Sequence, residues 1–351
     1  MSRSRLRTHR HRAAPAPARA SSGFTLIELM VALLLGLIVI AGVISVFLAN
    51  QQVYRTNQAI GDVQDGSRIA FEMMAHDIRG AGLTGCSNNG LIANVLNNGP
   101  TNSATPDWWA NMANPVQGYD LTEVDPAIAV GTTSSPPTRV ANTPSLELLG
   151  AADVGLSVLT DNAPTAASFT INGPSMAIQT GDVVIVCDPA QAAIFQITSY
   201  PGNNTVVHNT GAGTPGNCSK GLGYPAVCTT NGSPHAYGAN SQLAKLTAVD
   251  WFIGTNPLGG KSLYRSDLEN YKKIPTPTPQ EMVRDVTDMS ILYHQAPQTT
   301  FIRASAVKNW AAVDAVQVTL KVASTDKRAG TDVQPITRSF SATTTVRNRV
   351  N

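Results

Sequence analysis

The sequence lacks the short motifs that mark common hydrolases and nucleotide-binding enzymes. It contains no G-x-S-x-G, no H-E-x-x-H and no Walker loop. One G-x-G-x-x-G match lies at residues 211–216, but Asn217, Cys218 and a glycine-rich stretch follow it, where a dinucleotide site needs a helix. The histidines after residue 23 are scattered: His76, His208, His235 and His294. We therefore expect no enzyme activity and no cofactor.

Charged residues are also scarce, at 14% of the chain. Basic residues are nearly absent from residues 81–240, which hold Arg139 and Lys220 against nine acids. Nucleic acid or phosphate binding needs clustered Lys or Arg, so we expect neither kind of ligand in this region. Gly, Pro, Asn, Ser and Thr are abundant instead, which is typical of a loop-rich exported β protein.

Cysteine is limited to four residues, all after the long apolar run near the N-terminus. An even number in an exported chain allows two disulfides, with three pairings. We favour Cys218 with Cys228, closing a Gly/Pro-rich loop, which leaves Cys86 and Cys187 to tie the end of a helix to a sheet. A metal site is the alternative, but there is no CxxC and no His–Cys clustering, so no metal is expected.

Only one charge, Glu28, interrupts the apolar run from Phe24 to Ala49. As a helix this run would span ~39 Å at ~1.5 Å per residue, enough to cross a ~30 Å hydrocarbon core. A carboxylate inside such a helix costs ~2.5–3.5 kcal/mol near its centre, which favours a cationic partner from another segment of the same kind. The alternative interpretations of this apolar run are an ordinary signal anchor, with Glu28 at the membrane edge, and a cleaved signal peptide. The second fits worse, because its apolar region is usually only ~7–15 residues long.

The preceding segment, residues 1–23, is strongly basic. It contains six arginines and no acid. The positive-inside rule predicts that this leader lies in the cytoplasm. A basic arm for nucleic acid is the rival interpretation, but the adjoining apolar helix favours topology as the explanation.

Gly23 to Leu29, read as GFTLIEL after a basic leader and before an apolar helix, resembles the class III signal of type IV pilins and type II secretion pseudopilins. The resemblance implies that prepilin peptidase cuts after Gly23 and methylates the new amino terminus at Phe24. It also implies that Glu28 pairs with the terminal amine of a neighbouring subunit. Removing six arginines lowers Lys+Arg from 25 to 19 against 23 acids, so the net charge would fall from +2 to −4.

The helix is expected to continue through residues 50–80, which contain no proline. Apolar residues recur at three- and four-residue steps and predict a stripe packed on a sheet: Ile60, Val63, Ala70, Met74 and Ile78. Gly80, Gly82 and Gly85 should end the helix. His76 is expected to be a solvated helix residue.

Both ends of the chain extend the resemblance. Residues 50–86 are similar to the long helix and glycine-rich turn of PilW-type minor pilins, and residues 312–349 to the closing hairpin of PilW proteins and of the pseudopilin GspJ. The middle resembles nothing. There we expect short strands among loops at 145–149, 168–171, 182–187, 193–200 and 204–209. Trp108 and Trp109 are expected in a core rather than in an exposed binding patch.

From residue 241 onward the β pattern strengthens. Strands are predicted at 243–254, 261–268, 285–295, 315–324 and 336–347. Residues 300–351 carry eight basic groups and three acids, a local +5 that would either meet an acidic neighbour or form a solvated face.

The sequence therefore predicts an α+β, pilin-like fold with five segments. These are a cleaved leader (1–23), a transmembrane helix half (24–49), an amphipathic helix half (50–80), a loop-rich β region with disulfides (81–240) and an antiparallel sheet (241–351).

The predicted function is that of a minor pilin that initiates type IV pilus assembly near the fibre tip. The alternatives are a type II secretion pseudopilin and a tip adhesin that binds surfaces or host ligands. The expected partners are prepilin peptidase, other minor pilins, the major pilin, the inner-membrane assembly platform and, before assembly, membrane lipid. The expected location is the inner membrane with a periplasmic C-terminal domain, and then the pilus on the cell surface.

Overall fold

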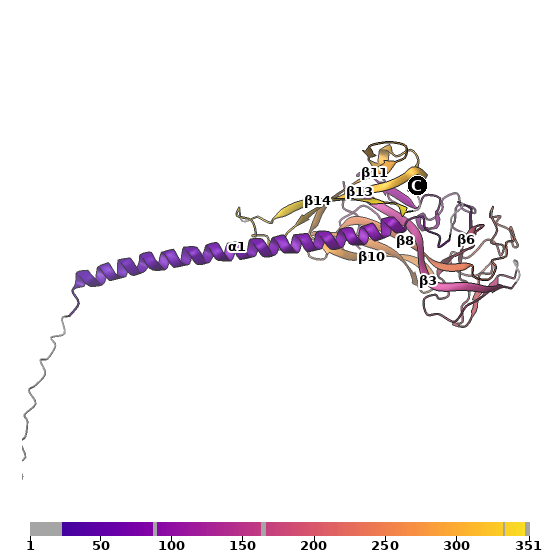
Figure 1. The fold of residues 1–351 in the computed structure, drawn as a ribbon, viewed down its shortest axis with the longest axis horizontal. Helices are drawn as coiled ribbons and strands as arrows, with labels where there is room; N and C mark the ends of the chain where they lie inside the picture. The colour runs from indigo at the N-terminus through magenta and orange to yellow at the C-terminus, as the bar shows by residue number, and fades with distance from the viewer. Residues whose placement is uncertain (1–22, 87–89, 163–165, 333, 348–351) are drawn as a thin grey trace, which may run out of the picture. The chain divides into compact units, whose positions relative to one another are not determined.

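The computed structural model describes residues 23–86, 90–162, 166–332 and 334–347 (Figure 1). The predicted leader thus lies outside the described residues except for Gly23. The chain divides into two compact units, residues 1–54 and a second unit that starts at Arg55, and each is described by itself. Helix α1, Leu26–Gly80, contributes to both.

The described part of the first unit is almost entirely helix. Within the described chain, α1 is the one helix long and apolar enough to cross a membrane, with a mean hydropathy of 3.0 over 18 residues, none of them buried. Large apolar side chains such as Leu33, Ile38 and Phe47 are more than half exposed. An apolar surface of this length is stable in lipid or against other apolar helices, and not in water.

The second unit contains the strands. The first seven are β1 (Ile92–Asn94), β2 (Val116–Tyr119), β3 (Ser145–Asp161), β4 (Ser168–Ile171), β5 (Val183–Cys187), β6 (Ala192–Gln196) and β7 (Thr205–Val207). The others are β8 (Gln242–Thr255), β9 (Lys261–Tyr271), β10 (Ile274–Arg284), β11 (Val286–Gln295), β12 (Phe301–Ile302), β13 (Val313–Ala323) and β14 (Thr337–Thr345). Three short 3-10 helices cover Trp108–Ala110, Ala304–Ala306 and Trp310–Ala312.

These strands form two sheets, so the fold is α+β as predicted. The ten-stranded sheet has the order β1-β6-β5-β8-β3-β4-β7, with β9 and β10 attached to β8 and β2 attached to β3. Its pairs are antiparallel except β1 with β6. The four-stranded sheet, in the orange to yellow part of Figure 1, has the order β12-β11-β13-β14.

The predicted apolar stripe of α1 packs on these sheets, with one change. The buried residues of the helix follow a 3.6-residue period: Ala59, Val63, Ser67, Ala70, Met74 and Ile78. Ile60 is only half-buried, because the periodicity places Ala59 on the stripe instead. Val63, Met74 and Ile78 share one core with Leu146, Trp251 and Val318, so α1 binds both sheets together.

The helix ends where its backbone meets β3. Gly82 has φ +78° and donates its N–H to the carbonyl of Leu149 at 2.8 Å. A Cβ on Gly150 would lie 2.5 Å from the carbonyl oxygen of Gly80, so this approach requires glycine at position 150.

Polar contacts fix the last turns of α1 on the sheet. The carboxylate of Asp77 accepts hydrogen bonds from Trp251 Nε1 at 2.9 Å and from Arg265 Nε at 2.8 Å. Arg265 also pairs with Asp267. We call Asp77, Trp251, Arg265 and Asp267 the Asp77 cluster. It joins the helix to β8 and β9 with charge-assisted bonds that are largely shielded from water.

The region 81–240 is more tightly built into the fold than its loop-rich composition suggests. β3 is much longer than the predicted strand at 145–149 and pairs with β8 from Ser145 to Ser157. β5 also pairs with β8. The middle strands and those after residue 241 therefore share one sheet. The predicted strands at 168–171, 182–187 and 204–209 correspond to β4, β5 and β7.

The Asp77 cluster should contribute measurably to the docking of α1. Replacing Asp77 by Asn removes the negative charge to which Arg265 and Trp251 donate hydrogen bonds. The substitution should lower the free energy of unfolding by about 2 kcal/mol. Urea unfolding of the full chain in detergent, followed by tryptophan fluorescence, measures this. The control is Glu72→Gln, which breaks an exposed i,i+4 pair with Arg68 and should cost less than about 0.5 kcal/mol. Equal effects of the two substitutions would contradict the assignment.

Candidate functional site

The predicted assembly residue Glu28 lies in the first turn of α1, in a capping box with Thr25. Thr25 Oγ1 accepts a hydrogen bond from the Glu28 N–H at 3.3 Å. In return, Glu28 Oε2 accepts from the Thr25 N–H and from Thr25 Oγ1, both at 3.0 Å. This is the S/T-x-x-E arrangement that satisfies two N–H groups of a helix start.

The capping box leaves half of the carboxylate available. Within the described residues, Glu28 Oε1 accepts no hydrogen bond, and the side chain is exposed on the apolar half of the helix. Phe24, the predicted new terminus, is 90% exposed beside it. An anionic oxygen fixed in direction by its own helix is suited to bind a cation from outside the chain.

The cysteines pair as the sequence analysis favoured. Cys86 bonds to Cys187 with a Cα–Cα distance of 5.9 Å, and Cys218 bonds to Cys228 at 4.9 Å. The first disulfide links the segment just after α1 to the end of β5. The second closes a ten-residue separation in the loops before β8.

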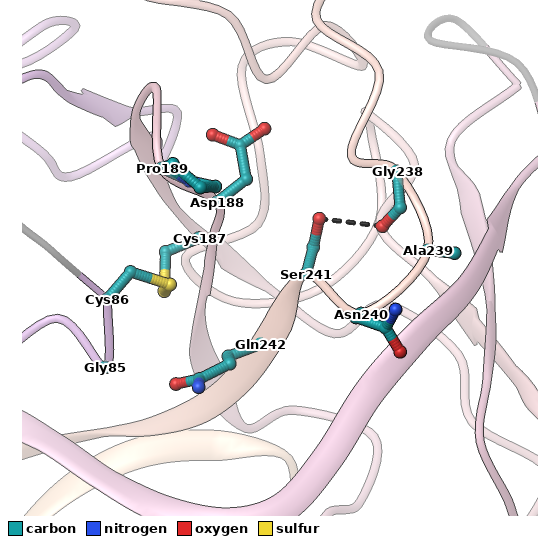
Figure 2. Close-up of a pocket in the computed structure, with 10 residues that line it drawn as sticks. All are labelled: Gly85, Cys86, Cys187, Asp188, Pro189, Gly238, Ala239, Asn240, Ser241 and Gln242. Carbon is teal, nitrogen blue, oxygen red and sulfur yellow. Dashed lines mark hydrogen bonds between the residues drawn. A yellow bond between two sulfur atoms is a disulfide. The ribbon is translucent and has the colours of Figure 1, made fainter.

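A pocket of about 610 Å³ lies beside the first disulfide (Figure 2). Figure 2 shows Cys86, Cys187, Asp188 and Pro189 on one side and the segment from Gly238 to Gln242 on the other. The Ser241 hydroxyl donates to the Gly238 carbonyl at 2.8 Å. No basic residue lines the pocket, so its lining favours neutral polar ligands over anions.

The polar groups of this pocket are partly engaged. Asp188 Oδ2 lies 2.7 Å from His235 Nε2, and Asp188 Oδ1 accepts the N–H groups of Ala190 and Gln191. Asn240 and Gln242 are exposed, and their carboxamides form no hydrogen bond with the described residues. These two side chains offer both donors and acceptors to a bound molecule.

The remaining residues considered from the sequence do not assemble into a site. His76 is exposed on α1, and His294 lies next to Asp314. His208 is buried against Phe169 at a ring distance of 4.8 Å, and burial lowers its pKa to about 4. Trp109 is buried and Trp108 half-buried in a core, as expected. The match at residues 211–216 is a turn-rich loop without a following helix.

Sequence reasoning missed a buried charged cluster at the pairing of β3 and β8. Glu147 and Asp250 are directly opposite in register, and Arg139 and Asp125 are also buried. Arg139 Nη1 donates to the Thr143 carbonyl at 3.2 Å and to Ser145 Oγ at 3.1 Å, and Tyr119 donates its hydroxyl to Glu147 Oε2 at 3.0 Å. Arg139 comes from a Thr/Pro-rich loop, so periodicity gave no signal for it.

Burial controls the protonation of this charged cluster. It raises the pKa of Glu147 from its ordinary value of 4.5 to about 9, with the charge of Asp125 adding to the rise. Burial also raises the pKa of Asp250 well above its usual range, aided by Asp125 and Glu147. Opposed buried carboxyls are stable when they carry protons, so both are neutral at pH 7.

No group of three or more His, Cys, Asp or Glu in the described chain is arranged to hold a metal ion.

Comparison with protein families finds two segments of this chain that match family models. The prokaryotic N-terminal methylation motif matches residues 18–44, which include Gly23, Phe24 and Glu28. The type IV pilus-assembly protein W family matches residues 250–349, from the end of β8 through β14. Together these two matches support a minor pilin of the PilW type. No curated protein and no solved structure gives a match.

As a PilW-type minor pilin, the chain is a processed subunit of type IV pilus assembly that α1 anchors in a membrane. The PilW match contains Trp251 and Arg265, which hold α1 on the sheet. Neither family match reaches residues 81–240, the region for which the sequence showed no resemblance. PilW proteins are assembly proteins, and the fold has the long helix and sheets that this role needs.

The charged cluster predicts how stability depends on pH. Glu147 and Asp250 hold protons in the folded chain that an unfolded chain releases above its ordinary carboxyl pKa. The contribution of these two protons to the free energy of unfolding is complete below about pH 4.5. It is lost as pH rises toward 9, by up to about 1.4 kcal/mol per pH unit for each proton. Urea unfolding at pH 6 and pH 9 measures this loss.

The substitution Asp250→Asn should weaken the pH dependence of the free energy of unfolding, because it replaces one of the protonated carboxyls by an amide that does not titrate. The exposed substitution Glu72→Gln should leave the dependence unchanged. Stability that rises from pH 6 to pH 9 would contradict the assigned protonation.

Proposed function

We propose that this minor pilin initiates type IV pilus assembly near the fibre tip and that Glu28 docks it to its neighbour. The observation that carries the proposal is the capping box, in which Thr25 holds Oε2 of Glu28 and leaves Oε1 exposed. Prepilin peptidase cuts after Gly23, and the methylated amine of Phe24 on one subunit binds Glu28 of another. This pairing removes an isolated charge from lipid, where such a charge is costly.

The distribution of charge and cysteine supports the orientation. Six arginines before Phe24 hold the leader in the cytoplasm, so the second unit lies in the periplasm before assembly. The two disulfides suit that oxidising compartment. The prepilin peptidase, other minor pilins, the major pilin and the inner-membrane platform are then the partners, and the assembled subunit reaches the cell surface in the pilus.

The position near the tip rests on where the second unit extends. α1 ends against Gly150, but β3 continues from Ala151 to Asp161, roughly 35 Å at ~3.3 Å per residue. A separate core, with Phe169, Phe195 and Tyr237, surrounds this continuation. Figure 1 shows these strands beyond the C-terminal end of α1. Such a head obstructs another subunit stacked above it, and a tip position avoids the obstruction.

Glu28→Ala should abolish incorporation into fibres while membrane insertion persists, because breaking a buried ion pair costs ~3–5 kcal/mol. Thr25→Ala keeps the carboxylate and loses only the cap, worth ~0.5–2 kcal/mol, so incorporation should fall by about thirtyfold or less. Mass spectrometry of sheared fibres, with membranes as reference, measures both variants. In the wild type it should also find a peptide that starts at methylated Phe24.

Normal incorporation of Glu28→Ala would refute the role of Glu28. A wild-type protein that keeps residues 1–23 and never enters a fibre would refute the whole proposal.

A tip adhesin is the second candidate, and the pocket beside Cys86–Cys187 is the observation that favours it. Deleting residues 90–235 cannot test it, because that removes β3 and β5 from the shared sheet. The exposed Gln242 allows a milder change: Gln242→Trp should fill the pocket. If the adhesin hypothesis holds, cells with this variant lose at least tenfold in surface attachment while their pilus number stays constant. Gln242→Ala is the control for the lost amide, and unchanged attachment of both variants argues against the hypothesis.

A further inference from the structure

Two long strands lie at open edges of the sheets, and only one is protected. β10 pairs only with β9. Its hairpin turns through Lys272 and Lys273, both with positive φ, so Tyr271 and Ile274 form the closing hydrogen-bonded pair. The following alternate residues therefore direct their backbone outward, and these are Pro275, Pro277 and Pro279. Proline has no N–H, so this edge cannot donate to another strand.

β14, at the edge of the four-stranded sheet, has no such protection. Two hydrogen bonds fix its phase: Val346 N–H to the Asp314 carbonyl, and Ser324 N–H to the Ile336 carbonyl, both at 2.8 Å. The register between them is unbroken. Even-numbered residues of β14 thus bond to β13, and the odd-numbered ones direct N–H and C=O outward. The outward residues are Thr337, Ser339, Ser341, Thr343 and Thr345.

The outward backbone groups of β14 are unpaired within the part of the chain that the structure describes. Among the described residues no strand lies on that side of β14, and no backbone hydrogen bond reaches its outward groups. The outward residues carry small hydroxyl side chains, which allow a new strand to approach at the usual ~4.8 Å. An unprotected edge of nine residues is a template for strand addition.

The charge beside this edge indicates what binds it. Arg338 on β14 and Lys321 on β13 are exposed, β14 contains no acid, and neither cation forms an ion pair within the described residues. Pairing β14 with β14 of a second copy would bring two sets of cations together. An acid-bearing segment has the opposite effect.

We propose that the edge of β14 binds, by β-strand addition, an extended acid-bearing segment of another pilus subunit. This inference rests on the proposed assembly function, because it assigns a surface to the subunit contact. The added strand would receive hydrogen bonds from the outward N–H groups of β14 and pair its carboxylates with Arg338 and Lys321.

Proline substitution tests the edge without breaking the sheet. Ser339→Pro with Ser341→Pro copies the spacing of β10 and removes two outward N–H groups while sparing every backbone hydrogen bond to β13. Ser339→Ala with Ser341→Ala is the matched control, since it loses the same hydroxyls, including the Ser341–Thr319 bond, and keeps both N–H groups. The full-length tagged chain is co-expressed in turn with the major pilin, each other minor pilin and an untagged copy of itself, and is purified in detergent.

The expected result is that one other subunit copurifies with the wild type and with the alanine variant, and that the proline variant recovers at least tenfold less. Hydrogen exchange on the same complex should slow at the outward amides of β14. Equal recovery by the proline and alanine variants, or unslowed outward amides in the complex, would overturn the proposal. So would a self-complex that the proline variant abolishes.

Arg338→Glu provides a second measurement that does not alter the backbone. It should reduce recovery at least fivefold at low salt, and unchanged recovery would overturn the acidic partner. Hydrogen exchange of the inward amides shows whether the proline variant still forms β14. If it does not, the proposal is tested by the recovery with Arg338→Glu and by exchange of the outward amides in the wild-type complex. Failure of the proposed function looks different, since the wild type would then remain unprocessed and outside fibres.

Discussion

The attachment of α1 to the sheets is the constraint on which the second unit depends. The helix side of that contact is narrow, because one stripe from Ala59 to Ile78 is buried. Asp77 adds a charged bond to Trp251 and Arg265, and glycine at 150 lets the two backbones touch. The same core contains residues of both sheets, so loosening the helix would also separate the sheets from each other.

The assembly proposals place function at the two ends of the chain and leave its middle to build the head. In these proposals Glu28 and Phe24 would act within lipid, where an unpaired charge is costly. The β14 edge would act in water, where strand pairing adds directional bonds. The two contacts are chemically independent, so a subunit would make both only when its helix and its sheet meet their neighbours together.

Sequence patterns predicted the helix and most strands because each has a local signal, and favouring the nearby pair Cys218–Cys228 left Cys86 and Cys187 as the second disulfide. The stripe on α1 and the alternation in β13 are such signals. β10 was not predicted, because its three prolines argue against a strand in the sequence. They are tolerated in this edge strand because their positions face outward, where no N–H is needed for pairing. The charged cluster was not predicted either. Glu147 and Asp250 are 103 positions apart in the sequence and meet only through the register of β3 with β8.

The disulfide between Cys86 and Cys187 has a mechanical consequence for a subunit of a fibre under tension. Cys86 lies six residues after the end of α1, and Cys187 ends a strand paired with β8. A pull on the helix therefore passes through the sulfur–sulfur bond into the central strands. The 100 residues between the two cysteines are excluded from this path and cannot be drawn out by force while the bond is intact.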